Sequence, residues 1–161
     1  MTIKIIHKEL SYKIVGVLFE VFDELGYGYK ENFYTNAIAR SFKIKGMHFN
    51  AQVPYKLIYK GGVIGKIFLD FLIESKIILE VKRGNYYSKK NIEQILNYLK
   101  MTGLELAILA NFTPNGVKFI RILNSPQYKK MQRNIKLISR KNYYVCKLVK
   151  KFVISLGLCQ N

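Results

Sequence analysis

The chain of 161 residues has only two cysteines, Cys146 and Cys159, both near its C-terminus. Two thiols cannot by themselves complete a tetrahedral zinc site or hold a four-cysteine iron–sulfur cluster. No apolar run approaches the ~20 residues that span a bilayer, and the N-terminal segment lacks a long apolar core and a small-residue cleavage site. We therefore expect a cytoplasmic protein with reduced thiols and no stable membrane insertion.

The sequence also lacks the motifs of several enzyme classes. It contains no GxxxxGK[ST] loop to cradle phosphates, no HExxH pair and no Ser-His-Asp arrangement. Its two histidines, His7 and His48, have no motif context. There are no internal repeats or low-complexity segments, so repeat architectures are excluded as well.

Acidic residues are scarce, because 10 Asp and Glu accompany 27 Lys and Arg and leave a net charge of +17. All ten acidic residues lie at or before Glu105, and residues 126–161 alone carry nine Lys and Arg. This excess indicates a polyanionic partner, nucleic acid first and an anionic membrane surface second, although charge can also serve solubility alone. Apolar residues interleave with the basic ones in 126–161, so this tail is predicted to form a basic amphipathic helix.

Eight secondary-structure elements are predicted from hydrophobic periodicity and turn residues in the first 125 residues. Three segments have apolar residues at helical spacing and end near Gly26, Gly46 and Gly103. The first and third helices are expected at residues 8–25 and 88–102, and the second, with Glu31 in its first turn, is expected to run to about Lys45. The strands are expected at 49–60, 63–74, 77–83, 104–112 and 117–123. A helix between strands implies a crossover, so we expect an α/β fold with a mixed sheet.

The residue pattern predicts which side chains of the second helix and of the first strand share a buried face. In the second helix this face is expected to consist of Phe33, Ala37, Ile38 and Phe42. In the first strand the odd-numbered residues from Phe49 to Tyr59 are expected to share one face of a half-exposed strand.

The stretch IFLDFLIESKIILEVKRG, residues 67–84, carries charged residues inside two short apolar strands. If the strands pair as a hairpin about Ser75, Asp70 and Glu80 lie opposite each other. Because side chains alternate along a strand, Glu80 and Lys82 share a face and Val81 points to the other. The ordinary alternative is a solvated strand face, but carboxylates and lysines are rarely buried unless they pair or bind a metal.

Two adjacent carboxylates repel unless a cation lies between them, and their hard oxygens favour Mg²⁺ or Mn²⁺. Such an ion polarises a phosphoryl oxygen and lowers the pKa of a bound water. Lys82 could orient that water or neutralise charge on a scissile phosphate. The cluster therefore predicts metal-assisted hydrolysis of a phosphodiester, in which Asp70 and Glu80 are metal ligands and the Val81 carbonyl is a third candidate.

Three further polar residues are left open by spacing alone. Glu31 lies in the first turn of a helix, where the helix dipole favours negative charge for purely structural reasons. Gln94 and Tyr98 lie four residues apart on one helix face, an arrangement that a solvated glutamine and a tyrosine at the edge of the core would also give.

At these residues the sequence resembles the PD-(D/E)XK nuclease superfamily. Its motif is an Asp on one strand and (D/E)xK on the next, matched by Asp70 and by Glu80-Val81-Lys82, with Leu69 where the motif has Pro. Gly28, Glu31 and Tyr34 resemble the GxxExxY family within that superfamily, and Gln94 and Tyr98 resemble the Q-x-x-x-Y motif of its RecB-like branch.

The resemblance implies a restriction-endonuclease-like αβββαβ core with helices flanking a mixed sheet. It covers roughly Leu10 to Leu123, and we accordingly expect a nuclease domain over residues 1–125 and a basic extension over 126–161. Glu31 would complete the metal-binding cluster, Lys82 would be the catalytic lysine, and Gln94 and Tyr98 would support the site or the nucleic-acid strand. DNA is the expected substrate, and a nucleic-acid-binding module that does not cut remains the alternative.

Overall fold

The computed structural model describes residues 5–124. The chain divides into two units, Met1–Leu123 and Asn124–Asn161, and the helix predicted in the basic tail lies outside the described residues, as do both cysteines. No helix in the described part is long and apolar enough to cross a membrane.

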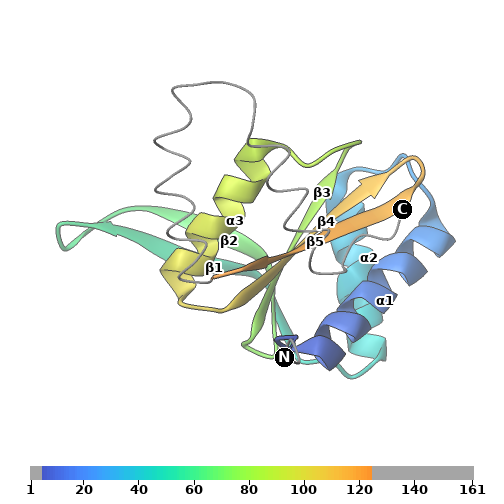
Figure 1. Ribbon diagram of the computed structural model, residues 1–161, viewed down its shortest axis with the longest axis horizontal. Coiled ribbons are helices and arrows are strands. Elements are labelled where there is room, and N and C mark those ends of the chain that lie inside the picture. The colour runs from blue at the N-terminus through green and yellow to red at the C-terminus, as the bar shows by residue number, and fades with distance from the viewer. Residues whose placement is uncertain (1–4, 125–161) are drawn as a thin grey trace. The chain divides into compact units, whose positions relative to one another are not determined.

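All eight predicted elements are present, and their order confirms the α/β prediction (Figure 1). Their ends fall within about two residues of those expected, which is ordinary variation at element ends. The helices are α1 (Lys8–Leu25), α2 (Glu31–Ile44) and α3 (Lys89–Thr102), and the strands are β1 (Phe49–Tyr59), β2 (Gly62–Ile73), β3 (Ile77–Arg83), β4 (Leu106–Thr113) and β5 (Gly116–Leu123).

The five strands form one mixed sheet in the order β1-β2-β3-β4-β5. The pairing of β3 with β4 is parallel, and the other three pairings are antiparallel. The parallel pair needs a crossover, which α3 provides. Ser88 caps that helix by accepting a hydrogen bond from the Asn91 backbone N–H at 3.1 Å, and Gly103 ends it in a left-handed conformation, as predicted.

Two apolar clusters cover the two faces of the sheet. Helices α1 and α2 pack on one face with Leu79 and Val81, and α3 packs on the other with Ile78 and Leu109 (Figure 1). Successive residues of β3 alternate between these clusters. Val81 consequently faces the α1–α2 side, and Glu80 leaves the strand on the other face, where it meets Gln94 of α3.

The apolar face predicted for α2 is wrong at one residue. Phe33 is 51% exposed, whereas Tyr34 is fully buried together with Ile38 and Phe42. These three residues are four apart, so they form one continuous stripe on the helix. Phe33 lies beside that stripe, and its ring makes an edge contact with Tyr29.

The single alternating face predicted for β1 is also wrong. Phe49 packs with the α1–α2 cluster, but Val53 and Tyr55 pack with the α3 cluster. Between them Gln52 has a left-handed φ of 51° and is missing from the regular pairs with β2. Such an irregularity bends and twists a strand, so side chains on either side of it no longer share one face.

Candidate active site

Asp70 lies at the position where β2 separates from β3. The two strands pair only at Phe71–Leu79, Leu72–Ile78 and Ile73–Ile77, a register symmetric about Ser75 as the sequence predicted. The next N–H along that edge of β3, that of Val81, donates to Asp70 Oδ2 at 2.9 Å. A side-chain carboxylate thus replaces the backbone acceptor that a continuing β2 would have supplied.

The second oxygen of Asp70 is held from the opposite strand. Gln52 Nε2 donates to Asp70 Oδ1 at 3.3 Å. Asp70 is therefore oriented by groups from both β1 and β3, which fixes the carboxylate at the end of the β2–β3 ladder. Gln52 was not singled out in the sequence, since a polar residue in a half-exposed strand carries no signal of this role.

Glu80 is almost completely buried, with 2% of its surface exposed. Its Oε1 lies 2.8 Å from Lys82 Nζ and accepts a hydrogen bond from Gln94 Nε2 at 3.2 Å. Burial, followed by the neighbouring Asp70 charge, raises the pKa of Glu80 to about 7, against a smaller lowering effect of Lys82. Its other oxygen, Oε2, is buried and has no hydrogen-bond partner among residues 5–124.

Lys82 lies between two carboxylates. Its Nζ is 2.8 Å from Glu80 Oε1 and 3.3 Å from Glu31 Oε1. Burial by itself would lower the pKa of Lys82, but the charges of Glu80, Glu31 and Asp70 outweigh it and raise the pKa above its ordinary value. Lys82 therefore remains a cation at neutral pH and bridges β3 to α2.

Glu31 is the first residue of α2, and its neighbours in the sequence fix its position. Gly28 has a φ of 127°, which an L-residue rarely adopts, in the turn that leads into the helix. The buried Tyr34 ring stacks on Phe112 of β4, with ring centroids 4.1 Å apart, and its hydroxyl donates to the Gly26 carbonyl at 2.8 Å. Tyr34 thus attaches the α1–α2 connection to the sheet.

Tyr27 connects the same α1–α2 segment to β3. The guanidinium of Arg83 lies over its ring, 5.0 Å from the centroid. Since Arg83 follows Lys82, this cation–π contact helps to fix the end of β3 beside the helix start that bears Glu31.

Gln94 and Tyr98 face Glu80 from α3. Gln94 Nε2 donates both to Glu80 Oε1 and to the Tyr98 hydroxyl. Tyr98 is 7% exposed, and burial raises the pKa of its hydroxyl above the ordinary value, so the hydroxyl stays protonated at neutral pH. The two residues form a polar connection from the helix to the buried carboxylate.

Asn111 also lies at this site and was missed in the sequence. It is the register partner of Lys82 on β4 and is 1% exposed. Its Nδ2 donates to the carbonyls of Gly84 and Tyr86, at 2.8 and 3.3 Å, which ties down the chain between β3 and α3. A polar residue inside a strand buried on both faces was the signal that could have found it.

Side chains at this site supply only some of the oxygen ligands that a hard divalent cation requires. In residues 5–124 no three His, Cys, Asp or Glu side chains gather closely enough to hold a metal ion. Asp70 and Glu80 supply carboxylate oxygens, of which Glu80 Oε2 is buried and unpaired. Mg²⁺ is commonly held by one or two carboxylates together with water and substrate phosphates. The pair therefore fits such an ion if backbone or substrate oxygens complete the shell.

Replacing Tyr34 by phenylalanine should destabilise the protein by about 1 kcal/mol, because the ring keeps its stacking on Phe112 while the Gly26 carbonyl loses its donor. Urea unfolding would measure the change. Tyr29→Phe is the matched control, since Tyr29 is 48% exposed, and it should alter the free energy of unfolding by less than about 0.5 kcal/mol. Equal stability of the two variants would show that the hydroxyl does not hold the connection.

Comparison with known proteins identifies one family. The model of the PD-(D/E)XK nuclease superfamily matches residues 8–122, which include every site residue described above. One solved structure, the crystal structure of SSO0001, is 17% identical over 84% of this chain and 68% of its own, with a TM-score of 0.48. An alkaline exonuclease from Laribacter hongkongensis is 12% identical over 97% of this chain and 89% of its own, with a TM-score of 0.46. No curated protein is significantly similar to the chain.

Proposed function

The chain belongs to the PD-(D/E)XK nuclease superfamily, and from this membership we propose that it is a metal-dependent deoxyribonuclease that hydrolyses phosphodiester bonds. The observation that carries the proposal is that Asp70, held where β2 leaves β3, is near enough for its charge to raise the pKa of Glu80, whose Oε1 lies 2.8 Å from Lys82 Nζ. The net charge of +17 is suited to a polyanionic substrate.

Asp70 and Glu80 would hold the cation, Mg²⁺ or Mn²⁺, with the Val81 carbonyl as a third ligand. The N–H and C=O of one strand residue point to the same side, and the Val81 N–H already points at Asp70. The bound ion would supply Lewis-acid polarisation of a phosphoryl oxygen and a bound water of lowered pKa. Glu31 is proposed as an outer member of this cluster, and its present contact is with Lys82.

Lys82 is proposed as the catalytic lysine. Because its pKa is raised, its ammonium group carries a positive charge to the site at neutral pH, where it can neutralise charge developing on the scissile phosphate. Gln94 and Tyr98 are proposed to orient Glu80 through the hydrogen bond from Gln94. Within the superfamily we assign the chain to the GxxExxY family and the RecB-like branch, on Gly28, Glu31 and Tyr34 and on the Gln94–Tyr98 pair.

A non-cleaving nucleic-acid-binding module is the second candidate, since the charge of +17 would serve it equally well. The cluster favours the enzyme, because a buried glutamate without a full set of partners is costly to retain in a protein that only binds.

Cleavage assays on linear, circular and single-stranded DNA, with a matched RNA, separate the two candidates. The purified full chain should cut at least one DNA substrate with Mg²⁺ or Mn²⁺ and none after chelation by EDTA. Salt-sensitive retardation of every substrate without cleavage under any metal would instead establish the binding module. Cleavage that persists in EDTA would contradict the metal-dependent mechanism.

A further inference from the structure

Strands β1 and β2 continue as a two-stranded ribbon after β2 has left β3. This ribbon arm, residues 53–69, keeps antiparallel pairing from Val53–Leu69 to Tyr59–Gly62. It extends away from the sheet beside α3 (Figure 1). From the level of Asp70 the arm runs about eight residues to its turn, or about 27 Å at the rise of a strand.

One face of the arm packs against the α3 cluster, and residues of the other face are exposed. Val53, Tyr55, Ile67 and Leu69 pack with the α3 cluster. On the opposite face Pro54, Lys56, Lys66 and Phe68 are exposed. The end of the arm is apolar and exposed on both faces, with exposed fractions of 55–63% for Ile58, Tyr59, Val63 and Ile64. Large apolar side chains exposed together at one end of a ribbon offer a surface for a partner.

Lys56 and Lys66 are direct register partners across the arm. Like charges directly opposite each other destabilise an antiparallel pair. Residues 49–69 contain no Asp or Glu, and neither lysine has an ion pair within the described part of the chain. The free protein therefore contains an uncompensated positive pair, which a bound polyanion would neutralise.

We propose that the ribbon arm binds duplex DNA, with Lys56 and Lys66 on the phosphate backbone and the apolar end in the major groove. The inference rests on the proposed function for the identity of the substrate. The lysine pair lies four residues from Asp70 along β2, about 13 Å, and the whole arm matches about eight base-pair steps. The major groove of B-form DNA admits a two-stranded ribbon, whereas that of A-form RNA is too narrow.

A second copy of this chain is a poorer occupant of the arm. A symmetric dimer brings the same patch of both copies together. Every charge on the arm is positive, so such a contact would bring unpaired lysines together without any carboxylate to offset them. Charge complementarity therefore favours nucleic acid.

The test compares two double variants of the full chain, Lys56→Ala with Lys66→Ala and, as the control, Lys13→Ala with Lys43→Ala. All four lysines are exposed, and the control pair lies on α1 and α2. Fluorescence anisotropy in EDTA, on a labelled duplex of about 30 base pairs, would give affinity as a function of salt. The arm variant should bind about 10- to 100-fold more weakly near 0.1 M salt, and its salt slope should fall by about 1.8. The affinity of the control variant should stay within about threefold of that of the wild type, because it loses only the general contribution of two positive charges.

Three results would overturn the inference. The first is an arm variant that matches the control in affinity and salt slope while the wild type binds and cuts DNA, which would reject DNA binding by the arm and leave the proposed function standing. A wild type that neither binds nor cuts any nucleic acid would remove both. The third would come from sedimentation of the double variant Ile58→Ser with Ile64→Ser. If the wild type is a dimer and this variant is a monomer that binds DNA equally well, the arm serves self-association.

Discussion

Asp70→Ala and Lys82→Ala should each lower the cleavage rate by at least about 100- to 1,000-fold, which is the usual cost of removing one group that stabilises transition-state charge. Asp70 is held by Val81 and Gln52 at the end of the β2–β3 ladder, so the substitution removes a carboxylate whose two oxygens are both positioned. Lys82 brings the cationic group nearest to Glu80 among the described residues. Single-turnover cleavage with saturating protein would measure the chemical step apart from substrate binding.

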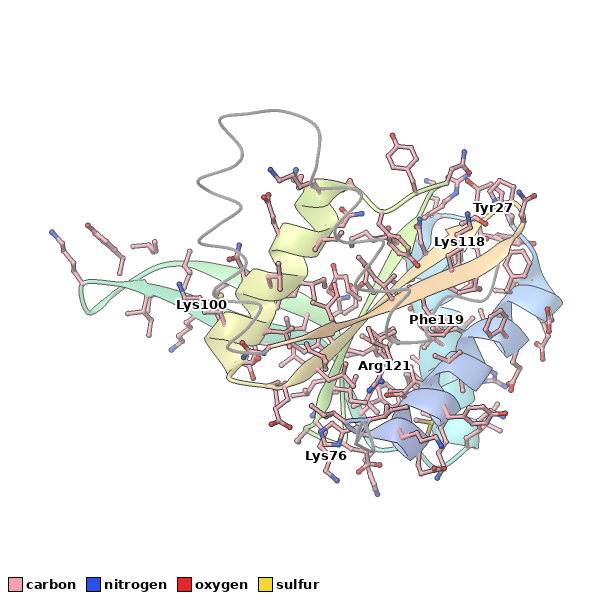
Figure 2. All side chains as sticks on the ribbon, viewed as in Figure 1. Tyr27, Lys76, Lys100, Lys118, Phe119 and Arg121 are labelled. Atoms are coloured by element: carbon pink, nitrogen blue, oxygen red, sulfur yellow. The ribbon has the colours of Figure 1, made fainter. Side chains whose placement is uncertain are left out.

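The control is Lys100→Ala, on the exposed surface of α3 (Figure 2). It removes the same charge and should retain cleavage within about threefold of the wild type, since exposed charges away from the site act only through the general field. Duplex affinity should change little in all three variants, because most of the positive charge is elsewhere. Wild-type rates in both purified site variants would contradict the assignment of this cluster, whatever the protein binds.

Removing Lys82 also tests the electrostatics of the cluster. Without it, Glu80 would be a buried carboxylate with Asp70 nearby and no cation, so it should take up a proton more readily. We expect the fold to survive for this reason, with the neutral acid still accepting the hydrogen bond from Gln94. A circular dichroism spectrum and a cooperative unfolding transition would verify that the loss of cleavage is not a loss of structure.

Much of this site could be predicted from local sequence. Hydrophobic periodicity and turn residues placed Asp70, Glu80 and Lys82 on neighbouring strands. The symmetry of a short hairpin about Ser75 then set their register. Buried charges inside apolar runs break the usual pattern for strands, and such breaks are expected at functional sites. The core position of Val81 follows from the same alternation.

The contacts between distant elements could not be predicted in this way. Lys82 meets Glu31 across 51 residues of sequence, and nothing in either local pattern specifies that meeting. Whether Phe33 or Tyr34 would be buried depended on the stacking of Tyr34 on Phe112, which belongs to a strand formed much later in the chain. The change of the buried face of β1 at Gln52 depends on a single backbone angle, which hydrophobic periodicity does not reveal.

One feature of the sheet links the site to the ribbon arm. Where β2 leaves β3, the Val81 N–H loses its backbone partner, and Asp70 replaces it. The separation that frees Asp70 is also the one that lets β1 and β2 leave the sheet as a ribbon. The position of the carboxylate and the direction of the arm are therefore set by the same break in the ladder.

Glu80→Gln should stabilise the metal-free protein above neutral pH by about 3 kcal/mol. Folding raises the pKa of Glu80 from 4.5 to about 7, so between these values the folded state binds more protons than the unfolded state. The stability that neutral Glu80 gives is complete below about pH 4.5 and is lost as the pH rises through 7. Glutamine stays neutral throughout and keeps an oxygen to accept from Gln94. The two proteins should therefore differ by less than about 1 kcal/mol at pH 5 and by about 3 kcal/mol at pH 8.

Urea unfolding in EDTA from pH 5 to 8.5 would measure this difference. Glu93→Gln is the matched control, because Glu93 is an exposed residue of α3, and it should follow the wild type at every pH. A divalent cation bound only by the folded state should reduce this difference at pH 8, since it raises the stability of the wild type and not that of Glu80→Gln. If Glu80→Gln is no more stable than the wild type at pH 8 in EDTA, Glu80 is not destabilised by its burial. If Mg²⁺ and Mn²⁺ stabilise both proteins equally, Glu80 is not a ligand.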